Sequence, residues 1–157
     1  MSTGPPSPVY VSVAGVSKSS AELDALAEQV GRLLAESGCV TVTGGLGGVM
    51  EAAARGASGA GGLVLGIVPS TDRATANRHC TLVAATGAGH ARNLAVAASG
   101  DVLIAIGESW GTLSEIAFAR TLGRTVVMLR GQALAGVVAV ETAQEAVSAA
   151  LAAVRAR

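Results

Sequence analysis

The sequence is poor in aromatic residues, in lysine and in cysteine, and each shortage narrows what the protein can be. Aromatic residues make up 2% of its 157 residues although 50% are hydrophobic, so we expect a core of Ala, Val, Leu and Ile. Lys18 is the single lysine, which argues against a pyridoxal enzyme such as a lysine decarboxylase. The 11 basic and 11 acidic residues form no basic cluster, so nucleic acid is not an expected partner.

Long apolar runs and a signal peptide are also missing. No segment approaches the roughly 18 apolar residues of a membrane span, and "MSTGPPSP" lacks the charged start and apolar stretch of an export signal. Cys39 and Cys80 do not have the spacing of a metal site or a disulfide framework. We therefore expect a cytoplasmic protein that neither binds a metal nor enters a membrane.

Apolar segments alternate with helical segments along the chain, after an expected disordered tail at 1–8. We expect strands at 9–15, 40–43, 63–69, 81–85, 101–107 and 125–129, and a seventh at 136–140; the helices are expected at 19–38, 44–61, 89–99, 111–123 and 142–157. The strands are apolar throughout their length, which is typical of a parallel sheet covered by helices on both faces. Residues 9–157 are thus predicted to form a single doubly wound, Rossmann-like α/β domain with a mostly parallel sheet of six or seven strands.

Two Gly-rich turns follow predicted strands, at 44–48 and 107–112, and each opens a predicted helix. Ligands of open parallel sheets bind beyond the carboxyl ends of the strands, and the free N–H groups and dipole of a helix N-terminus attract anions. Neither turn matches G-x-G-x-x-G or G-x-x-x-x-G-K-[ST], so an ordinary NAD or ATP site is disfavoured. Close packing of strand against helix is the alternative explanation for these glycines.

The candidate residues for binding an anionic ligand come from these turns and from the end of the first strand. They are Gly15, Gly44, Gly45, Gly47, Gly48, Gly107, Ser109, Trp110, Gly111 and Thr112. Trp110 either stacks on a flat ring of the ligand or packs at a contact between subunits. Glu108 would repel a phosphate dianion by about 1–4 kcal/mol at 4 Å if it pointed inward.

Glu115 has two interpretations. The spacing of a helix capping box occurs at Ser19/Glu22, Thr112/Glu115 and Thr142/Glu145. Capping by Thr112 would therefore be enough to explain Glu115. Its place just beyond a strand, with Arg92 expected nearby on the preceding helix, is what favours a functional role.

The motifs around these residues resemble the LOG-like family, the Rossmann-type group that includes the Lonely Guy phosphoribohydrolases, over residues 9 to about 150. "TGGLGGVMEAA" is similar to the family's first glycine-rich turn. "GESWGTLSE" keeps Gly111, Thr112 and Glu115 of the family's PGGxGTxxE but replaces its Pro-Gly-Gly. "HARN" keeps the His and Arg of H-x-R-K, with Arg92 in place and Asn93 instead of the lysine.

The resemblance leaves two functions open. In the Lonely Guy enzymes the residues matching Arg92 and Glu115 serve hydrolysis of a nucleoside 5′-monophosphate to base and ribose 5-phosphate. The phrases "GGVMEA", "ARN" and "GTLSEIA" are more similar to a branch that includes the molybdenum-cofactor carriers, which bind a phosphorylated pterin without hydrolysing it. The first expectation is thus a phosphorylated nucleotide-like ligand that is bound and not cleaved, either a nucleoside monophosphate or a phosphorylated pterin, with no cofactor required. The second is a phosphoribohydrolase.

Self-association is a further expectation. The Ala-rich helices expected at 89–99 and 112–122 carry few charges, which suits close packing between subunits. The sequence therefore predicts a homodimer or a higher homo-oligomer.

Overall fold

The fold, seen in a computed structural model, is described for residues 6–157. The strands of this part of the chain are β1 (Tyr10–Gly15), β2 (Val40–Thr43), β3 (Val64–Val68), β4 (Leu82–Ala85), β5 (Val102–Ile106), β6 (Thr125–Leu129) and β7 (Val138–Val140). Its helices are α1 (Ala21–Glu36), α2 (Val49–Gly59), α3 (Arg92–Ser99), α4 (Trp110–Thr121) and α5 (Ala143–Arg155), with short 3-10 turns at Arg73–Thr75 and Gly89–Ala91. Most of the tail expected at 1–8 lies outside the described residues.

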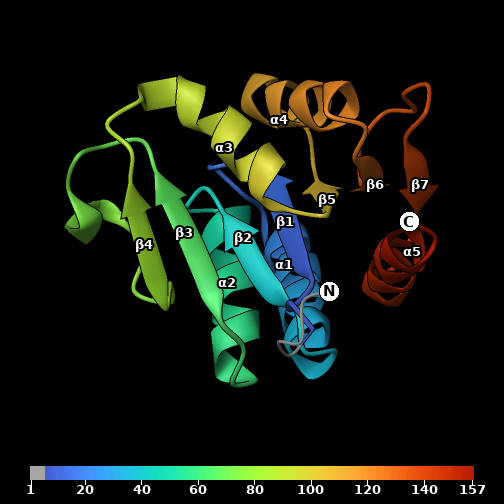
Figure 1. Cartoon of the computed structure of the whole chain (residues 1–157), viewed down its shortest axis with the longest axis horizontal. Coiled ribbons are helices and arrows are strands. Elements are labelled where there is room, and N and C mark those ends of the chain that lie inside the picture. Colours follow the sequence, from blue (N-terminus) through green and yellow to red (C-terminus); the bar gives the residue numbers. More distant parts are fainter. Residues whose placement is uncertain (1–5) are drawn as a thin grey trace.

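All seven strands pair in parallel, in the order β4-β3-β2-β1-β5-β6-β7. The chain winds outward from β1 to β4, returns to place β5 beside β1, and winds outward again to β7. Helices α1, α2 and α5 cover one face of the sheet, whereas α3 and α4 cover the other (Figure 1). This confirms the predicted doubly wound α/β fold and places its switch point between β1 and β5.

Strand β5 shows why the strands read as continuous apolar runs. All five of its residues are buried, and successive side chains point to opposite faces of the sheet. Ile104 and Ile106 pack in the cluster beneath α1 and α5, whereas Leu103 and Ala105 pack beneath α3 and α4. Burial on both faces is therefore achieved mainly with aliphatic side chains, as the composition predicts, with Cys39, Met128 and Phe118 added to the two clusters.

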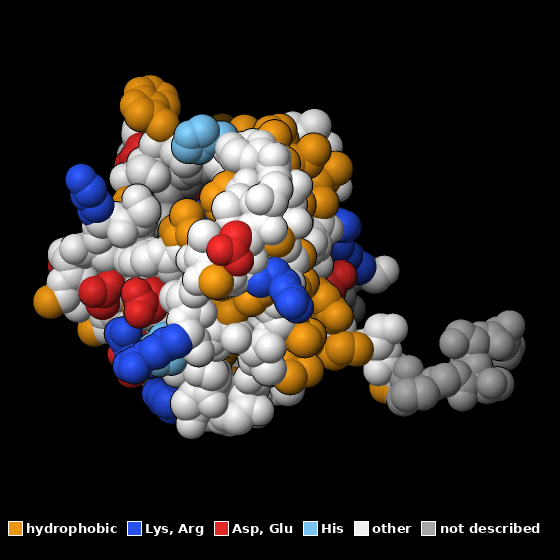
Figure 2. All heavy atoms as spheres, turned by 90° about the vertical axis from the view of Figure 1, so that its left-hand side faces the viewer, with side chains coloured by type: hydrophobic (Ala, Val, Ile, Leu, Met, Phe, Trp, Pro, Cys, Tyr) orange, Lys and Arg blue, Asp and Glu red, His pale blue; other side chains and the backbone are white. Residues whose placement is uncertain are grey.

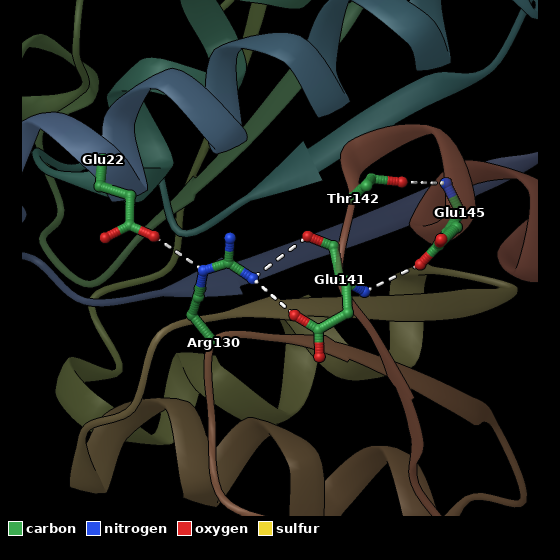
Figure 3. Close-up of polar contacts among 5 residues, drawn as sticks. All are labelled: Glu22, Arg130, Glu141, Thr142 and Glu145. Carbon is green, nitrogen blue, oxygen red and sulfur yellow. Dashed lines mark hydrogen bonds and ion pairs between the residues drawn. The ribbon is translucent and has the colours of Figure 1, made fainter.

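The start of α1 differs from the sequence-based expectation. Ser20, not Ser19, caps the helix, because its Oγ accepts from the N–H of Leu23 at 3.3 Å. The capping box predicted for Ser19 and Glu22 is therefore wrong. Glu22 instead accepts from Nε of Arg130 at 2.7 Å (Figure 3).

Arg130 joins three elements at the carboxyl end of the sheet. It follows β6 in a left-handed conformation (φ 57°), and its Nη1 donates to the backbone oxygen and to Oε2 of Glu141 while Nε holds Glu22 on α1 (Figure 3). The Oγ of Thr142 caps α5 as predicted, whereas the Glu145 carboxylate accepts from the N–H of Glu141. These contacts fix the carboxyl ends of β6 and β7 relative to α1.

Two absences concern function. Within residues 6–157 no helix combines the length and apolar character needed to cross a bilayer. Within the same residues, no three His, Cys, Asp or Glu side chains are grouped so that they could hold a metal ion.

Candidate functional site

The candidate site lies where the loops after β1, β2 and β5 meet at the switch point. Gly15 and Ile106 are register partners at the ends of β1 and β5, so these two strands finish level. The N–H of Val49, at the start of α2, donates to the backbone oxygen of Val16 at 3.0 Å, which joins the loop after β1 to the turn after β2. Parallel strands thus bring three predicted loops to one edge of the sheet.

The first glycine turn, residues 44–48, leads from β2 into α2 without a side-chain cap. Its last residue, Gly48, is the N-cap of α2 and has φ 66° and ψ −132°, a conformation essentially restricted to glycine. A Cβ there would also lie 2.3 Å from the Val16 oxygen. The N–H of Val49 is already bonded to the Val16 oxygen, and no side chain occupies the helix N-terminus. The N–H groups of Met50 and Glu51, which have no acceptor among the described residues, therefore remain for an anion.

Asn77 fixes the path of this turn from outside. Its backbone N–H donates to the Gly45 oxygen at 2.8 Å, and its Nδ2 donates to the Leu46 oxygen at 2.9 Å. Gly47, next along the turn, is half-buried. The long polar segment after β3 therefore contributes a brace for the glycine turn.

Arg92, the first residue of α3, is buried against the first glycine turn. It is 8% exposed, and its Nη2 donates to the Gly44 oxygen at 3.2 Å. A Cβ at Gly44 would lie 2.7 Å from Met50 Sδ and 2.8 Å from that Nη2, so a side chain there would displace these two side-chain ends. Burial lowers the pKa of Arg92, and its Nε has no hydrogen-bond partner among the described residues.

Glu115 lies on α4 close enough to feel the charge of Arg92. It is 6% exposed, and burial raises the pKa of its carboxyl from 4.5 to about 7 although the Arg92 guanidinium acts to lower it. Within residues 6–157 its carboxylate receives no hydrogen bond, and the ion pairs do not include one between Arg92 and Glu115. The site thus contains a buried guanidinium and a buried carboxyl that lie near each other but form no ion pair.

The second glycine turn, after β5, differs from the first because a side chain caps its helix. The N–H of Gly107 donates to the Leu129 oxygen at 2.9 Å. Ser109 is the N-cap of α4, and its Oγ accepts from the N–H of Thr112 at 3.1 Å. The predicted capping box of Thr112 and Glu115 is wrong, because the helix begins two residues earlier, at Trp110, and buries both side chains.

Side chains of the second turn point in different directions. The carboxylate of Glu108 accepts from the backbone N–H and from Nε2 of Gln132, so it faces away from Arg92 and toward the loop after β6. Trp110 is 87% exposed, and Gly111 is exposed beside it at the start of α4. The repulsion considered for an inward-pointing Glu108 therefore does not arise.

A hollow opens on the side of the first turn. It has a volume of about 200 Å³ and is lined by Leu46, Pro69, Gly89, His90 and Arg92. A wider groove of about 740 Å³ runs between α1 and α2, where it is bordered by the exposed ion pairs Arg32–Glu36 and Arg55–Glu28. The smaller hollow is the one that a buried, incompletely bonded cation faces.

Two polar residues of the site were not among the candidates. Asn93 accepts from Nη1 of Arg92 and donates through Nδ2 to Ser114 Oγ at 3.0 Å. Ser114 in turn donates to the Gly111 oxygen at 2.7 Å. The sequence offered one signal, since Asn93 stands where the H-x-R-K motif has lysine, but no signal connected it to Ser114.

Comparison with known proteins identifies the class of protein that this fold and rim define. The chain is a LOG-like Rossmann protein of a branch near the molybdenum cofactor carriers. It belongs to the SLOG cluster4 family, whose model matches residues 8–155. An uncharacterized protein of Archaeoglobus fulgidus is 41% identical over 141 residues, which cover 89% of this chain and 93% of that protein.

Two solved structures are similar to this protein over nearly its whole length. The molybdenum cofactor binding protein of the phototrophic bacterium Rippkaea orientalis has a TM-score of 0.88 and 31% identity, with 93% of this chain and 97% of that chain covered. The molybdenum cofactor carrier protein of Chlamydomonas reinhardtii has a TM-score of 0.86 and 27% identity, with 95% and 99% covered. The resemblance to this family predicted from the motifs is confirmed.

Proposed function

We propose that this protein binds a phosphorylated, nucleotide-like ligand at the carboxyl rim of its sheet and carries it without cleaving it. The observation that carries the proposal is Arg92, a buried guanidinium with an unpartnered Nε beside an uncapped helix N-terminus. A buried charge is costly unless it is neutralised, and an anionic ligand in the hollow that Arg92 lines would neutralise it. The ligand classes that fit are a phosphorylated pterin and a nucleoside monophosphate.

The phosphate would lie against the first glycine turn. Beyond the bonded N–H of Val49, the start of α2 offers the N–H groups of Met50 and Glu51 and the positive end of a helix dipole. Arg92 supplies a full charge at the same edge. Glu108 turns toward Gln132, so the carboxylate at this helix start is that of the half-buried Glu51, in the first turn of α2. The likeness to a molybdenum cofactor binding protein and a molybdenum cofactor carrier protein supports a pterin as the flat part of the ligand.

Trp110 could serve this flat part. Its indole is 87% exposed at the start of α4, and exposed aromatic faces stack on planar heterocycles. The alternative is that a second subunit, and not a ligand, covers the indole of Trp110.

Thermal unfolding and calorimetry test the proposal. We expect AMP, other nucleoside monophosphates or isolated molybdopterin to raise the melting temperature, with no free base released from the monophosphates. Inorganic phosphate alone should bind more weakly, because it leaves the flat surface unused. No stabilisation by any of these compounds would refute the proposal.

Hydrolysis is the second candidate, and Glu115 is the observation that favours it. A buried carboxyl with a pKa of about 7 beside a guanidinium can orient a water and accept its proton. Water would add to C1′ of the monophosphate as the N-glycosidic bond breaks, which yields ribose 5-phosphate and the protonated base. If adenine is released from AMP by the wild-type protein and not by Glu115→Gln, this function replaces the carrier.

We further propose that the protein is a homo-oligomer of the cytoplasm. Leu94 and Leu122 are exposed on α3 and the end of α4, and Leu82 is exposed on the edge strand β4. Figure 2 looks onto the β4 side, where hydrophobic and uncharged atoms cover most of the surface between a few charged side chains. Light scattering tests self-association, and a monomer at micromolar concentration would refute it.

A further inference from the structure

The side-chain amide of Asn93 is hydrogen-bonded through both its oxygen and its nitrogen. Asn93 is 4% exposed, follows Arg92 in the first turn of α3, and has hydrogen-bond partners on both sides of its amide. Its Oδ1 accepts from Arg92 Nη1, and its Nδ2 donates to Ser114 Oγ on α4. Ser114 Oγ donates to the Gly111 oxygen. A continuous chain of hydrogen bonds therefore runs from the guanidinium to the start of α4.

The two acceptors that bind the Arg92 guanidinium are both uncharged. Nη2 is held by the Gly44 oxygen and Nη1 by Asn93 Oδ1, so both terminal nitrogens have neutral acceptors. A guanidinium ordinarily prefers a carboxylate, which it can grip with two parallel hydrogen bonds. Glu115 is buried nearby and feels the charge of Arg92, yet the two form no ion pair among the described residues.

We propose that Asn93 is a positioning residue that holds the Arg92 guanidinium against the first glycine turn and out of an ion pair with Glu115. The held arrangement keeps the cation available for an anionic ligand and keeps the carboxyl free of a protein partner. The part of this inference that concerns a ligand rests on the proposed function. The part that concerns Arg92 and Glu115 applies to the free protein and is tested there.

A purely structural role would look different in one measurable quantity, the charge state of Glu115. Burial raises the pKa of Glu115, and Arg92, on α3, is the charged group among residues 6–157 whose field acts on it in the opposite direction. If Arg92 is released from Asn93 and pairs with Glu115, the carboxylate becomes more favoured and its pKa falls. A loose tie between α3 and α4 would lower stability without moving this pKa in the remaining folded protein.

The experiment is a ¹³C NMR titration of glutamate side-chain carboxyls in the free protein, with Glu115→Gln to assign the signal. Asn93→Leu removes both hydrogen bonds at nearly constant volume, and we expect the pKa of Glu115 to fall by about one unit or more. Asn93→Asp keeps an acceptor for Arg92 and adds a negative charge, so the pKa should stay or rise. Ser99→Ala, which removes a hydroxyl bonded to the Ala95 oxygen on the same helix, should leave it unchanged.

A fall of the Glu115 pKa in Asn93→Leu without a fall in Asn93→Asp supports the proposal. No fall in Asn93→Leu, or an equal fall in both variants, overturns it. If Asn93→Leu does not fold, Ser114→Ala replaces it, because this variant removes the hydroxyl that accepts from Asn93 Nδ2. We then expect a smaller fall in the pKa of Glu115. An unchanged pKa would overturn the proposal. In a parallel titration with AMP, Asn93→Leu should bind about tenfold more weakly than wild type. If wild type does not bind AMP, the proposed function loses support while the pKa of Glu115 still decides the role of Asn93.

Discussion

The two glycine turns at the rim look alike in the sequence but are built differently. The first turn ends at Gly48, has no side-chain cap, and is braced from outside by Asn77. The second begins α4 with a Ser109 cap, and the N–H of Gly107 is already bonded to the Leu129 oxygen. The first turn has bonded N–H groups as well, because Val49 donates to the Val16 oxygen and Gly45 to Thr43 Oγ1. The turns therefore differ in what caps the helix, a backbone oxygen in the first and a side chain in the second.

The comparison teaches that glycine content alone does not define an anion site. The hollow beside Arg92 borders the first turn, whereas the second turn contributes Trp110 and the helix that carries Glu115. We therefore propose that the first turn binds phosphate and that the second contacts a flat ring. Four experiments test this division.

The largest effect is expected from a Cβ at Gly48. Gly48→Ala forces alanine into φ 66° and brings its Cβ within 2.3 Å of the Val16 oxygen, so the free energy of unfolding should fall by about 3 kcal/mol or more. Gly111→Ala is the matched control, because its Cβ would lie 3.7 Å from Ser109 Oγ inside a helix. Urea unfolding should show the control unchanged or slightly more stable. Equal losses would mean that both turns are equally constrained.

The pH dependence of the free energy of unfolding tests the carboxyl of Glu115. The pKa of Glu115 is about 7 in the folded protein against 4.5 for an ordinary carboxyl, so the folded state holds an extra proton between these values. Stability from this group is therefore present below pH 4.5 and is lost as the pH rises to about 7, by on the order of 2–3 kcal/mol. Urea unfolding at pH 5 and pH 8 measures it, and Glu115→Gln should lose less stability across this range than wild type. A wild-type protein that gains stability over the range relative to the variant would contradict the expected sign.

Arg92→Met tests the cation of the first turn. It keeps the buried volume but removes the charge and the bond to the Gly44 oxygen, so AMP affinity should fall by about 10- to 100-fold. Arg73→Met, on the exposed 3-10 turn after β3, is the control and should change affinity by less than about twofold. Calorimetry compares the two, and equal weakening would remove Arg92 from the site.

Ser109→Ala has the smallest expected effect and tests the second turn. Loss of the cap should cost about 1 kcal/mol of stability while AMP affinity changes little. Ser20→Ala removes the equivalent cap of α1 and should behave the same way. A tenfold loss of affinity in Ser109→Ala alone would show that the second turn also holds the phosphate.

The fold was predictable because its signals are local and redundant. Continuous apolar strands such as β5 and amphipathic helices such as α1 repeat along the chain, and their alternation leaves few topologies. Helix starts were less predictable: Ser20 and Ser109 cap helices that the Ser/Thr-x-x-Glu spacing placed elsewhere. Neighbouring hydroxyls compete for the same N–H groups, and the geometry of the preceding loop decides between them.

The location of the candidate site was predictable from the sequence, but the hydrogen bonds within it were not. The rule that ligands bind beyond parallel strands brought Arg92 and Glu115 into consideration, and both are buried at that edge. The outward turn of Glu108 depends on Gln132, 24 residues later, and the relay of Asn93 depends on Ser114, 21 residues later. The contact of Asn93 depends on how α3 packs on α4, and that of Glu108 on how the loops after β5 and β6 meet. The pattern of one sequence specifies neither.

Trp110 has a practical consequence. It is the only tryptophan of the chain and stands open to water at the edge of the site, so the protein's emission above the tyrosine band comes from this one indole. A ring that stacks on it would quench or shift that emission directly. The molecule therefore contains its own fluorescent reporter, and occupancy of the rim can be followed in unlabelled protein, in real time and at low concentration.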